Sequence, residues 1–198
     1  GSVNIRGNVD KATIEAHLDV TVRGGVFGKP GVHIRAGHDV NLHFAENAVI
    51  QAFNDVVVAD TLLQCDVRAG SVIVFKKSGG PACVGGRIVA SGGIEATVLG
   101  SPTSPARTLC QIEVDPRLQR MRAQWLQDLE DEAARGRDGD PRKIALLKAK
   151  IETAERQIAR QRKAGISVAE RIYPGVEIII DDVRYLPSSE LTRVRFVL

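Results

Sequence analysis

"IRAGHDV", Ile34 to Val40, occurs with small changes at two other places in the chain. It returns as "IEAHLDV" at residues 14–20 and as "IQAFNDV" at residues 50–56, with Ile, Ala, Asp and Val kept. Shorter relatives are "VRAGSV" at residues 67–72 and "IVASGGI" at residues 88–94. The five starts lie 20, 16, 17 and 21 residues apart. A repeat of this length, rich in β-branched residues and glycines, predicts a β-solenoid in which each coil stacks on the one before.

Alternation within the phrase predicts which side chains face inward. Ile34 and Ala36, then Val40, Leu42 and Phe44, lie two residues apart and are expected to point into the coil. The repeated Ala is expected at a narrow inward corner, at positions 16, 36, 52, 69 and 90. The letters at positions 37 and 38 are expected to vary because they lie outside. The glycine-rich stretches at residues 23–31 and 76–86 predict turns, so residues 3–114 are interpreted as a short parallel β-helix.

Two helices are predicted to interrupt the coil over residues 115–164. Asp115 and Asp140 each precede a proline, which is the pattern of a helix N-cap and first turn, and Gly136 and Gly165 are expected to end the helices. Apolar residues at three-four spacing predict a coiled-coil seam, and the short connector "GRDGD" at residues 136–140 predicts antiparallel packing. The seam on the second helix consists of Ile144, Leu147, Ile151, Ala154 and Ile158, and that on the first of Leu118, Met121, Trp125 and Leu129.

Strands are predicted again after the helices. The phrase "YPGV" at residues 173–176 has Pro and Gly at the centre of a type II turn, and alternating segments lie on both sides of it. The last stretch, "TRVRFVL" at residues 192–198, predicts one more strand. Residues 165–198 are therefore expected to complete or cap the β-helix, because an open end of a β-stack is prone to aggregation.

Composition limits the class of protein. Of the 198 residues 43% are hydrophobic and only 4% aromatic, so the core is expected to be aliphatic. The formal net charge is +3; residues 1–114 carry ten basic and ten acidic side chains, residues 115–164 thirteen and nine, and residues 165–198 four and five. A nucleic-acid module normally has a stronger basic stripe with interleaved aromatics, so we expect no nucleic-acid partner.

Cysteine usage and the missing targeting signals indicate a cytoplasmic protein. Cys65, Cys83 and Cys110 are odd in number and form no C-x-x-C pair, so we expect free thiols rather than a disulfide framework or a zinc ribbon. No apolar run approaches the roughly 20 residues that span a bilayer, and no signal peptide is visible. Gly1 and Ser2 resemble the remainder of an expression tag, so we expect the natural chain to begin earlier with a further domain.

The order of these parts resembles the flagellar assembly protein A family. The resemblance rests on the I-x-A-x-x-D-V repeats, "VDP" at residues 114–116, the charged helical pair, "IYPGVEI" at residues 172–178 and "VRF" at residues 194–196. It covers nearly all of residues 3–198. It implies a mainly β fold, a right-handed single-stranded parallel β-helix interrupted by an antiparallel α-helical coiled-coil hairpin. It also implies a bacterial cytoplasmic protein linked to flagellar assembly or polar placement, with no catalytic residue to transfer.

Two groups of polar residues invite a chemical interpretation. Asp19, Asp39 and Asp55 are expected to form a column along one edge of the coil, each accepting hydrogen bonds from backbone N–H groups at its own bend. A cation that bridges the column and a catalytic acid pair are the alternatives. His17, His33, His38 and His43 are expected on solvent-facing turns, because their offsets in the repeat do not converge. We therefore predict no catalytic, cofactor or metal site.

A basic cluster at the end of the second helix is the candidate partner-binding site: Arg156, Arg160, Arg162 and Lys163. Cations there complement the helix dipole, and Glu152 can pair with Arg156 one turn on. The cluster is either a solvated helix face or a site for an acidic protein partner or an anionic membrane surface.

We predict a non-enzymatic scaffold or assembly factor that contacts other proteins, such as flagellar or polar assembly factors. No cofactor is expected, and neither is contact with a membrane surface. The sequence leaves open whether the chain forms a homo-oligomer. The alternatives are a carbohydrate-active, lyase-like enzyme on the β-helix and a module that self-associates into filaments.

Overall fold

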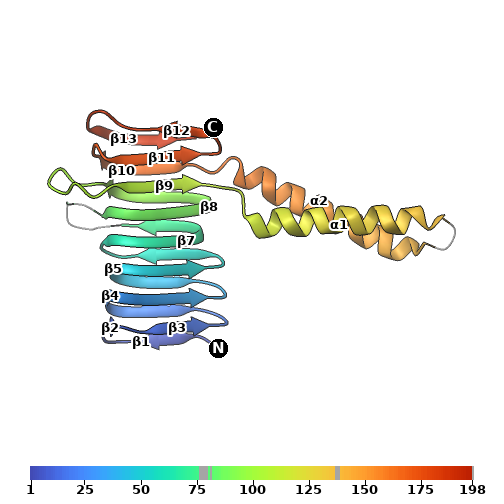
Figure 1. Ribbon diagram of the computed structural model, residues 1–198, viewed down its shortest axis with the longest axis horizontal. Coiled ribbons are helices and arrows are strands. Elements are labelled where there is room, and N and C mark those ends of the chain that lie inside the picture. The colour runs from blue at the N-terminus through green and yellow to red at the C-terminus, as the bar shows by residue number, and fades with distance from the viewer. Residues whose placement is uncertain (76–79, 81, 137–138, 198) are drawn as a thin grey trace. The chain divides into compact units, whose positions relative to one another are not determined.

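The computed structural model describes residues 1–75, 80, 82–136 and 139–197, without the side chains of residues 29, 30 and 160. The chain is mainly β, and its strands form a β-solenoid (Figure 1). In chain order the elements are β1 (Val3–Ile5), β2 (Val9–Asp10), β3 (Thr13–Ala16), β4 (Val20–Ala36), β5 (Val40–Ala52), β6 (Asp55–Val58), β7 (Leu62–Val74), β8 (Cys83–Leu99), β9 (Thr108–Ile112), α1 (Pro116–Ala134), α2 (Pro141–Gln161), β10 (Ile166–Ile172), β11 (Val176–Ile180), β12 (Val183–Tyr185) and β13 (Leu191–Phe196).

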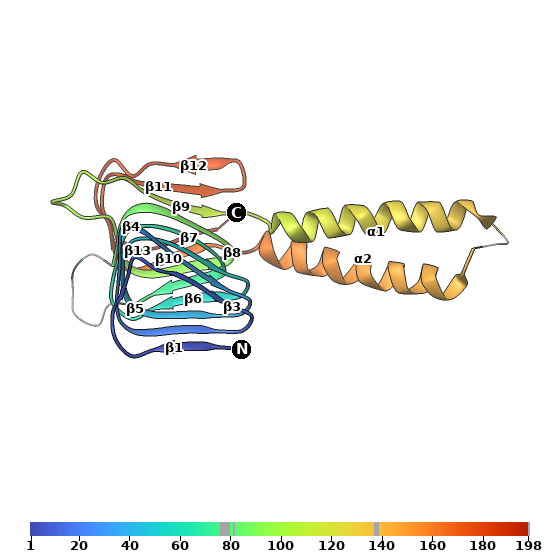
Figure 2. The same ribbon diagram turned by 60° about the horizontal axis from the view of Figure 1, so that its bottom comes forward.

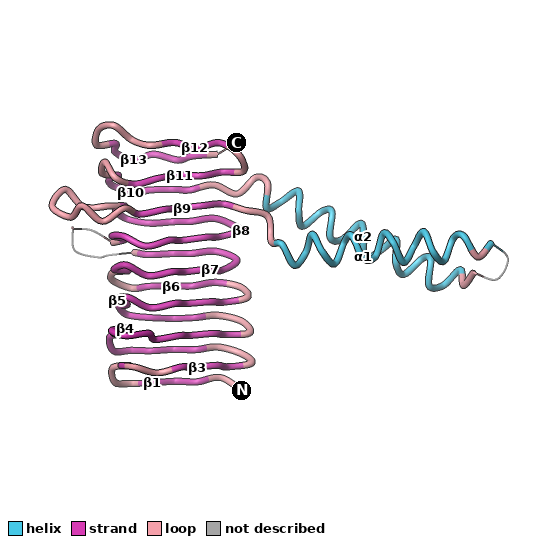
Figure 3. Tube along the Cα trace, in the orientation of Figure 1, coloured by secondary structure: helices cyan, strands magenta, loops and turns pink. Residues whose placement is uncertain are grey.

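The repeated phrase determines how the coils are stacked. Strands β1 to β9 pair in parallel, and each coil lies on the one before (Figure 3). The first residues of the five phrases pair in a single column: Ile14, Ile34, Ile50, Val67 and Ile88. The same column continues through Cys110 and Ile178, which belong to no recognisable phrase. The solenoid predicted from the repeat is confirmed.

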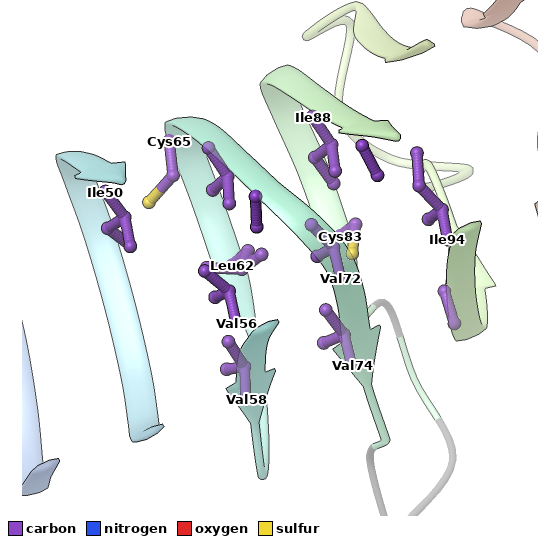
Figure 4. Packing of buried hydrophobic residues seen from close by; sticks show 14 of the residues in the cluster. Ile50, Val56, Val58, Leu62, Cys65, Val72, Val74, Cys83, Ile88 and Ile94 are labelled. Carbon is purple, nitrogen blue, oxygen red and sulfur yellow. The ribbon is translucent and has the colours of Figure 1, made fainter. Parts of the chain in front are cut away.

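The interior of the solenoid is aliphatic. A second column runs beside the first: Val3, Val20, Val40, Val56, Val72, Ile94 and Ile166. All of its members except Val3 are fully buried. Figure 4 shows Val56, Val72 and Ile94 from this column with Ile50 and Ile88 from the first. Because coils lie about 4.8 Å apart, each side chain contacts its equivalents above and below, and each buried one stabilises the fold by roughly 1.5 to 3 kcal/mol.

Two expectations about inward side chains need correction. The corner position does not require a small residue throughout, because Ala90 pairs with Ile112 and both are buried. Phe44 does not face inward; Ala45 occupies the interior and the Phe44 ring is only half-buried. The alternation of inward and outward side chains is broken at this point of the coil. The pairing of β4 with β5 shifts register between Val22 and Gly25, which interrupts the simple alternation.

Gly37 is required by the packing of neighbouring coils, so the expectation that this position is free to vary is wrong. A Cβ atom on Gly37 would overlap the backbone carbonyl oxygen of His17 on the coil below. Gly86 is restricted in the same way by the carbonyl oxygen of Cys65, and its φ of +84° also disfavours a side chain. At both positions the close approach of two backbones selects glycine.

The glycine-rich stretch at residues 23–31 is part of β4 rather than a separate turn. The strand bends there, because Gly31 has a φ of +69° and the pairing with β5 shifts register between Phe27 and Val32. The second predicted glycine-rich turn, at residues 76–86, includes residues 76–79 and 81, which lie outside the described part of the chain.

The last strands continue the stack and then reverse direction. β10 pairs in parallel with β8, and β11 pairs in parallel with β9. β12 and β13 then pair antiparallel with β11 and β10. The predicted turn at residues 173–176 is confirmed, because the Val176 N–H donates to the Tyr173 carbonyl at 3.4 Å and Gly175 has a φ of +94°.

Two compact units make up the described chain. One consists of residues 1–113 and 164–198 and contains all the strands, and the other consists of residues 114–163 and contains α1 and α2. Within the second unit the helices lie side by side and run in opposite directions (Figure 2). No helix in the described residues has an apolar stretch long enough to cross a membrane.

Candidate interaction surface

The two helices begin where the Asp-Pro pairs predict. The Asp115 and Asp140 carboxylates each accept a hydrogen bond of 2.8 Å from the N–H two residues on, which satisfies a donor of the first helical turn. Gly136, with a φ of +59°, follows the end of α1 as expected. Gly165 does not end α2, which stops at Gln161. Residues 137 and 138 of the predicted connector lie outside the description.

The contact between the helices involves most of the predicted apolar residues. Leu147, Ile151 and Ala154 on α2 are buried, and Lys150 places its ammonium 5.6 Å from the ring centre of Trp125 on α1. The remaining predicted residues Ile144, Ile158, Leu118 and Leu129 are half-buried.

Met121 does not belong to this contact, and its prediction is wrong. Its side chain is 48% exposed, and the neighbouring residue Arg122 contacts the facing helix instead. The Arg122 guanidinium donates to Glu155 on α2 at 2.7 Å and 3.1 Å. A spacing rule that counts only apolar residues selects Met121, whereas the opposite charge on the facing helix favours Arg122.

Glu132 joins the two helices and was missed by the sequence analysis. Its buried carboxylate accepts hydrogen bonds from the Lys143 ammonium at 2.6 Å and from the Asp140 N–H at 3.0 Å, and it lies 3.4 Å from Arg135. The hydrogen bond from the Asp140 backbone, together with that from Lys143, lowers the pKa of the Glu132 carboxyl. Glu132 therefore links the end of α1 to the start of α2.

Two of the three predicted partner-binding side chains that the structure describes line one depression. Arg156 is exposed and lies 3.3 Å from Glu152, as the spacing predicted. Arg162 and Lys163 are exposed and line a depression of about 580 Å³, together with Arg122 and Glu155. The side chain of the fourth residue, Arg160, lies outside the described part of the structure. The described basic surface is therefore centred on Arg162 and Lys163.

The aspartates of the repeat link neighbouring coils. The Asp19 carboxylate accepts a hydrogen bond from the Asp39 N–H at 3.3 Å, and the Asp39 carboxylate accepts one from the Asp55 N–H at 3.2 Å. The expectation that each Asp caps its own bend is thus wrong in one respect, because the donor belongs to the coil above. The Ser2 hydroxyl donates to Asp19 at 3.2 Å and begins the ladder. The Asp that recurs in the phrase therefore joins one coil to the next by a hydrogen bond.

The other candidate residues are not brought together. His17, His33, His38 and His43 are all exposed; His33 and His43 lie within strands β4 and β5 rather than on turns. Within the described ranges, no group of three His, Cys, Asp or Glu side chains could hold a metal ion.

The three thiols are free and lie in the core. Burial raises the pKa of Cys65 to about 11 and that of Cys110 to about 12, and burial likewise raises the pKa of Cys83. The thiolate, which is the reactive form of cysteine, is therefore disfavoured at neutral pH. The thiols pack as small apolar side chains.

The fold agrees with a comparison against known families. Residues 1–142 match the family described as the flagellar assembly protein A beta solenoid domain. The chain belongs to this family. No curated protein and no solved structure matches the chain. The family is one of flagellar assembly proteins, and the matched residues include the stacked coils from β1 to β9 and the first helix.

Proposed function

We propose that this chain is a non-enzymatic scaffold or assembly factor for bacterial flagella, which acts in the cytoplasm through contacts with other proteins. The observation that carries the proposal is the family match over residues 1–142. The use of side chains supports it. The inward residues of the solenoid pack in columns, and outward side chains on successive coils form a continuous surface suited to binding partners.

We further propose that α1 and α2 form an antiparallel coiled-coil hairpin, and that the coils of the solenoid wind in a right-handed sense. The hairpin is supported by the buried positions of Leu147, Ile151 and Ala154 at three-four spacing. Leu147→Ala is expected to lower the melting temperature of the helices strongly, because large-to-small changes at buried Leu cost about 2 to 5 kcal/mol. Leu146→Ala is the matched control, since Leu146 is 55% exposed.

The basic surface at Arg162 and Lys163 is proposed to bind an acidic surface of a protein partner. Both side chains are exposed and face the same depression. A partner carboxylate in this depression would gain charge-assisted hydrogen bonds from both side chains.

The test is complementation of a bacterium that lacks this protein. Arg162→Glu combined with Lys163→Glu is expected to reduce the number of flagella or to displace them, as counted by electron microscopy, at unchanged protein abundance. The matched control is Arg142→Glu combined with Lys148→Glu, which reverses the same charge on exposed residues elsewhere on α2. Normal flagella in the deletion strain would refute the flagellar role. Equal defects in both double variants would refute the specific basic surface.

A further inference from the structure

The two ends of the solenoid are apolar. Strands β1, β2 and β3 lie at one end of the stack, and β12 and β13 lie at the other (Figure 1). Within the described residues each of these strands pairs along one edge only, so its other edge is open to a further strand. Inward side chains are half-buried or exposed at both ends: Val3, Ile5, Ala12, Ile14 and Ala16 at the first, here named the head, and Val183, Tyr185, Leu191, Val194 and Phe196 at the second, here named the tail.

The core columns of the solenoid run from the head to the tail. Three columns begin at a head residue and end at a tail residue: Ile14 to Tyr185, Val3 to Phe196 and Ile5 to Val194. A second copy that continues the stack in the same orientation places each of its head residues over the tail residue of the same column. The exposed apolar groups are then covered in the way that internal coils cover one another, which removes them from water.

Charge favours this arrangement over its alternatives. The outward column that begins at Glu15 ends at Arg184. The outward column that begins at Asn4 ends at Arg195. Contact between a head and a tail therefore sets a carboxylate over one guanidinium and an amide over the other. Two tails in contact instead bring together strands that each carry an outward arginine, and directly opposed like charges are destabilising.

The charged groups at both ends are available for such a contact. Arg184 is 58% exposed, although its Nε lies 2.6 Å from Glu177 on the neighbouring strand. A guanidinium has five N–H donors, so this ion pair leaves others for a second carboxylate. Glu15 is exposed on β3. Arg6 and Arg193 carry like charges at one corner of the contact, where both are exposed and their repulsion is screened by salt.

We propose that the tail of one copy binds the head of a second copy, so that the solenoids stack end to end. β12 and β13 then pair antiparallel with β3 and β1 of the second copy, because they run against the direction of the other strands. The contact is heterologous, so each copy keeps a free head or tail and the stack can grow beyond a dimer. This inference goes beyond the proposed function and does not depend on it.

The test is sedimentation velocity of the full chain at increasing protein concentration. The sedimentation coefficient of the natural chain is expected to rise beyond that of a dimer. Glu15→Arg alters only the head and Val183→Arg only the tail, and both side chains are exposed. Each variant is expected to lose the concentration dependence at an unchanged melting temperature. An equimolar mixture of the two is expected to form dimers and nothing larger, because the intact tail of the first binds the intact head of the second.

Matched controls carry the same substitutions away from the two ends. Glu95→Arg changes an exposed outward residue on β8, a strand that is paired along both edges. Phe53→Arg changes a side chain that is 58% exposed at the bend between β5 and β6. Both controls are expected to associate as the natural chain does. A natural chain that stays monomeric, self-association of either end variant alone, or a mixture without dimers would overturn the proposal. Sedimentation and flagellar complementation are separate readouts, so either proposal can fail alone.

Discussion

Replacement of Asp39 tests the hydrogen-bond ladder that joins the repeated phrases. The Asp39 carboxylate accepts the Asp55 N–H from the coil above at 3.2 Å, and Asp39→Ala leaves this half-buried donor without an acceptor. We expect Asp39→Ala to lower the free energy of unfolding by about 1 kcal/mol. Asp39→Asn retains an acceptor oxygen and is expected to stay within about 0.5 kcal/mol of the natural chain.

The magnitude is a balance of two effects. A hydrogen bond to a charged acceptor stabilises by about 1.5 to 3 kcal/mol, and the long distance here places it near 2 kcal/mol. Carboxylates about 4.8 Å apart repel by roughly 1 kcal/mol in water and by about half of that at physiological salt. Asp39 has such a neighbour on each side, Asp19 and Asp55, so its removal relieves about 1 kcal/mol of repulsion. The net loss in the free energy of unfolding is therefore about 1 kcal/mol for Asp39→Ala and close to zero for Asp39→Asn.

The assay is urea unfolding of the full chain, followed by far-ultraviolet circular dichroism. Asp55→Ala is the matched control, because within the described residues the Asp55 carboxylate accepts no hydrogen bond although it belongs to the same column. We expect this control to cause no loss of stability. If Asp39→Asn is as costly as Asp39→Ala, the charge itself is required and the ladder does not explain the phrase. If calcium raises the urea midpoint of the natural chain but not that of Asp39→Asn, a cation bridges the aspartates.

Three further measurements test other parts of the fold. Gly86→Ala is expected to lower the free energy of unfolding by about 3 kcal/mol, because its φ is +84° and its Cβ overlaps the Cys65 carbonyl, whereas Gly7→Ala, with open space around it, is expected to change it by less than about 0.5 kcal/mol. The raised thiol pKa values mean that the stabilising effect of burying the protonated thiols is complete below the unfolded-state pKa near 9 and is lost as the pH rises through about 11 to 12. The free energy of unfolding should therefore fall as the pH rises above about 9. If it falls equally steeply in a Cys65→Ala, Cys110→Ala double variant, these two thiols are not the cause. Because the pKa of Glu132 is lowered in the folded chain, its stabilising effect is complete above the unfolded-state value of 4.5 and is lost as the pH falls through the folded-state pKa. Glu132→Gln is expected to lower the melting temperature of the helices at neutral pH and to remove this dependence on acid pH. An unchanged acid transition in the variant would exclude Glu132 as its source.

Much of the fold could be predicted from local sequence patterns. The repeat predicted the core column, because stacked coils place equivalent residues directly above each other, as Ile34 and Ile50 show. The Asp-Pro pairs predicted the helix starts, since an N-cap depends on neighbours within one turn. The candidate site was predicted less well. The basic residues near the end of α2 were identified, but the spacing predicted Met121 in the contact between the helices, where Arg122 pairs with Glu155 instead. Charge pairing across two helices cannot be seen in the spacing of one helix.

The sequence by itself determined the period of the coil, its aliphatic interior and the positions of the two helices. Each of these three features depends on the order and spacing of residue types over a short stretch of the chain. Only the tertiary structure decided that Asp39 binds the coil above, that Gly37 must lack a side chain and that Ile14 and Tyr185 end the same column. These features depend on contacts between residues roughly one coil or more apart in the chain. Their geometry follows from how the coils stack, and no local pattern specifies which backbone atoms then meet.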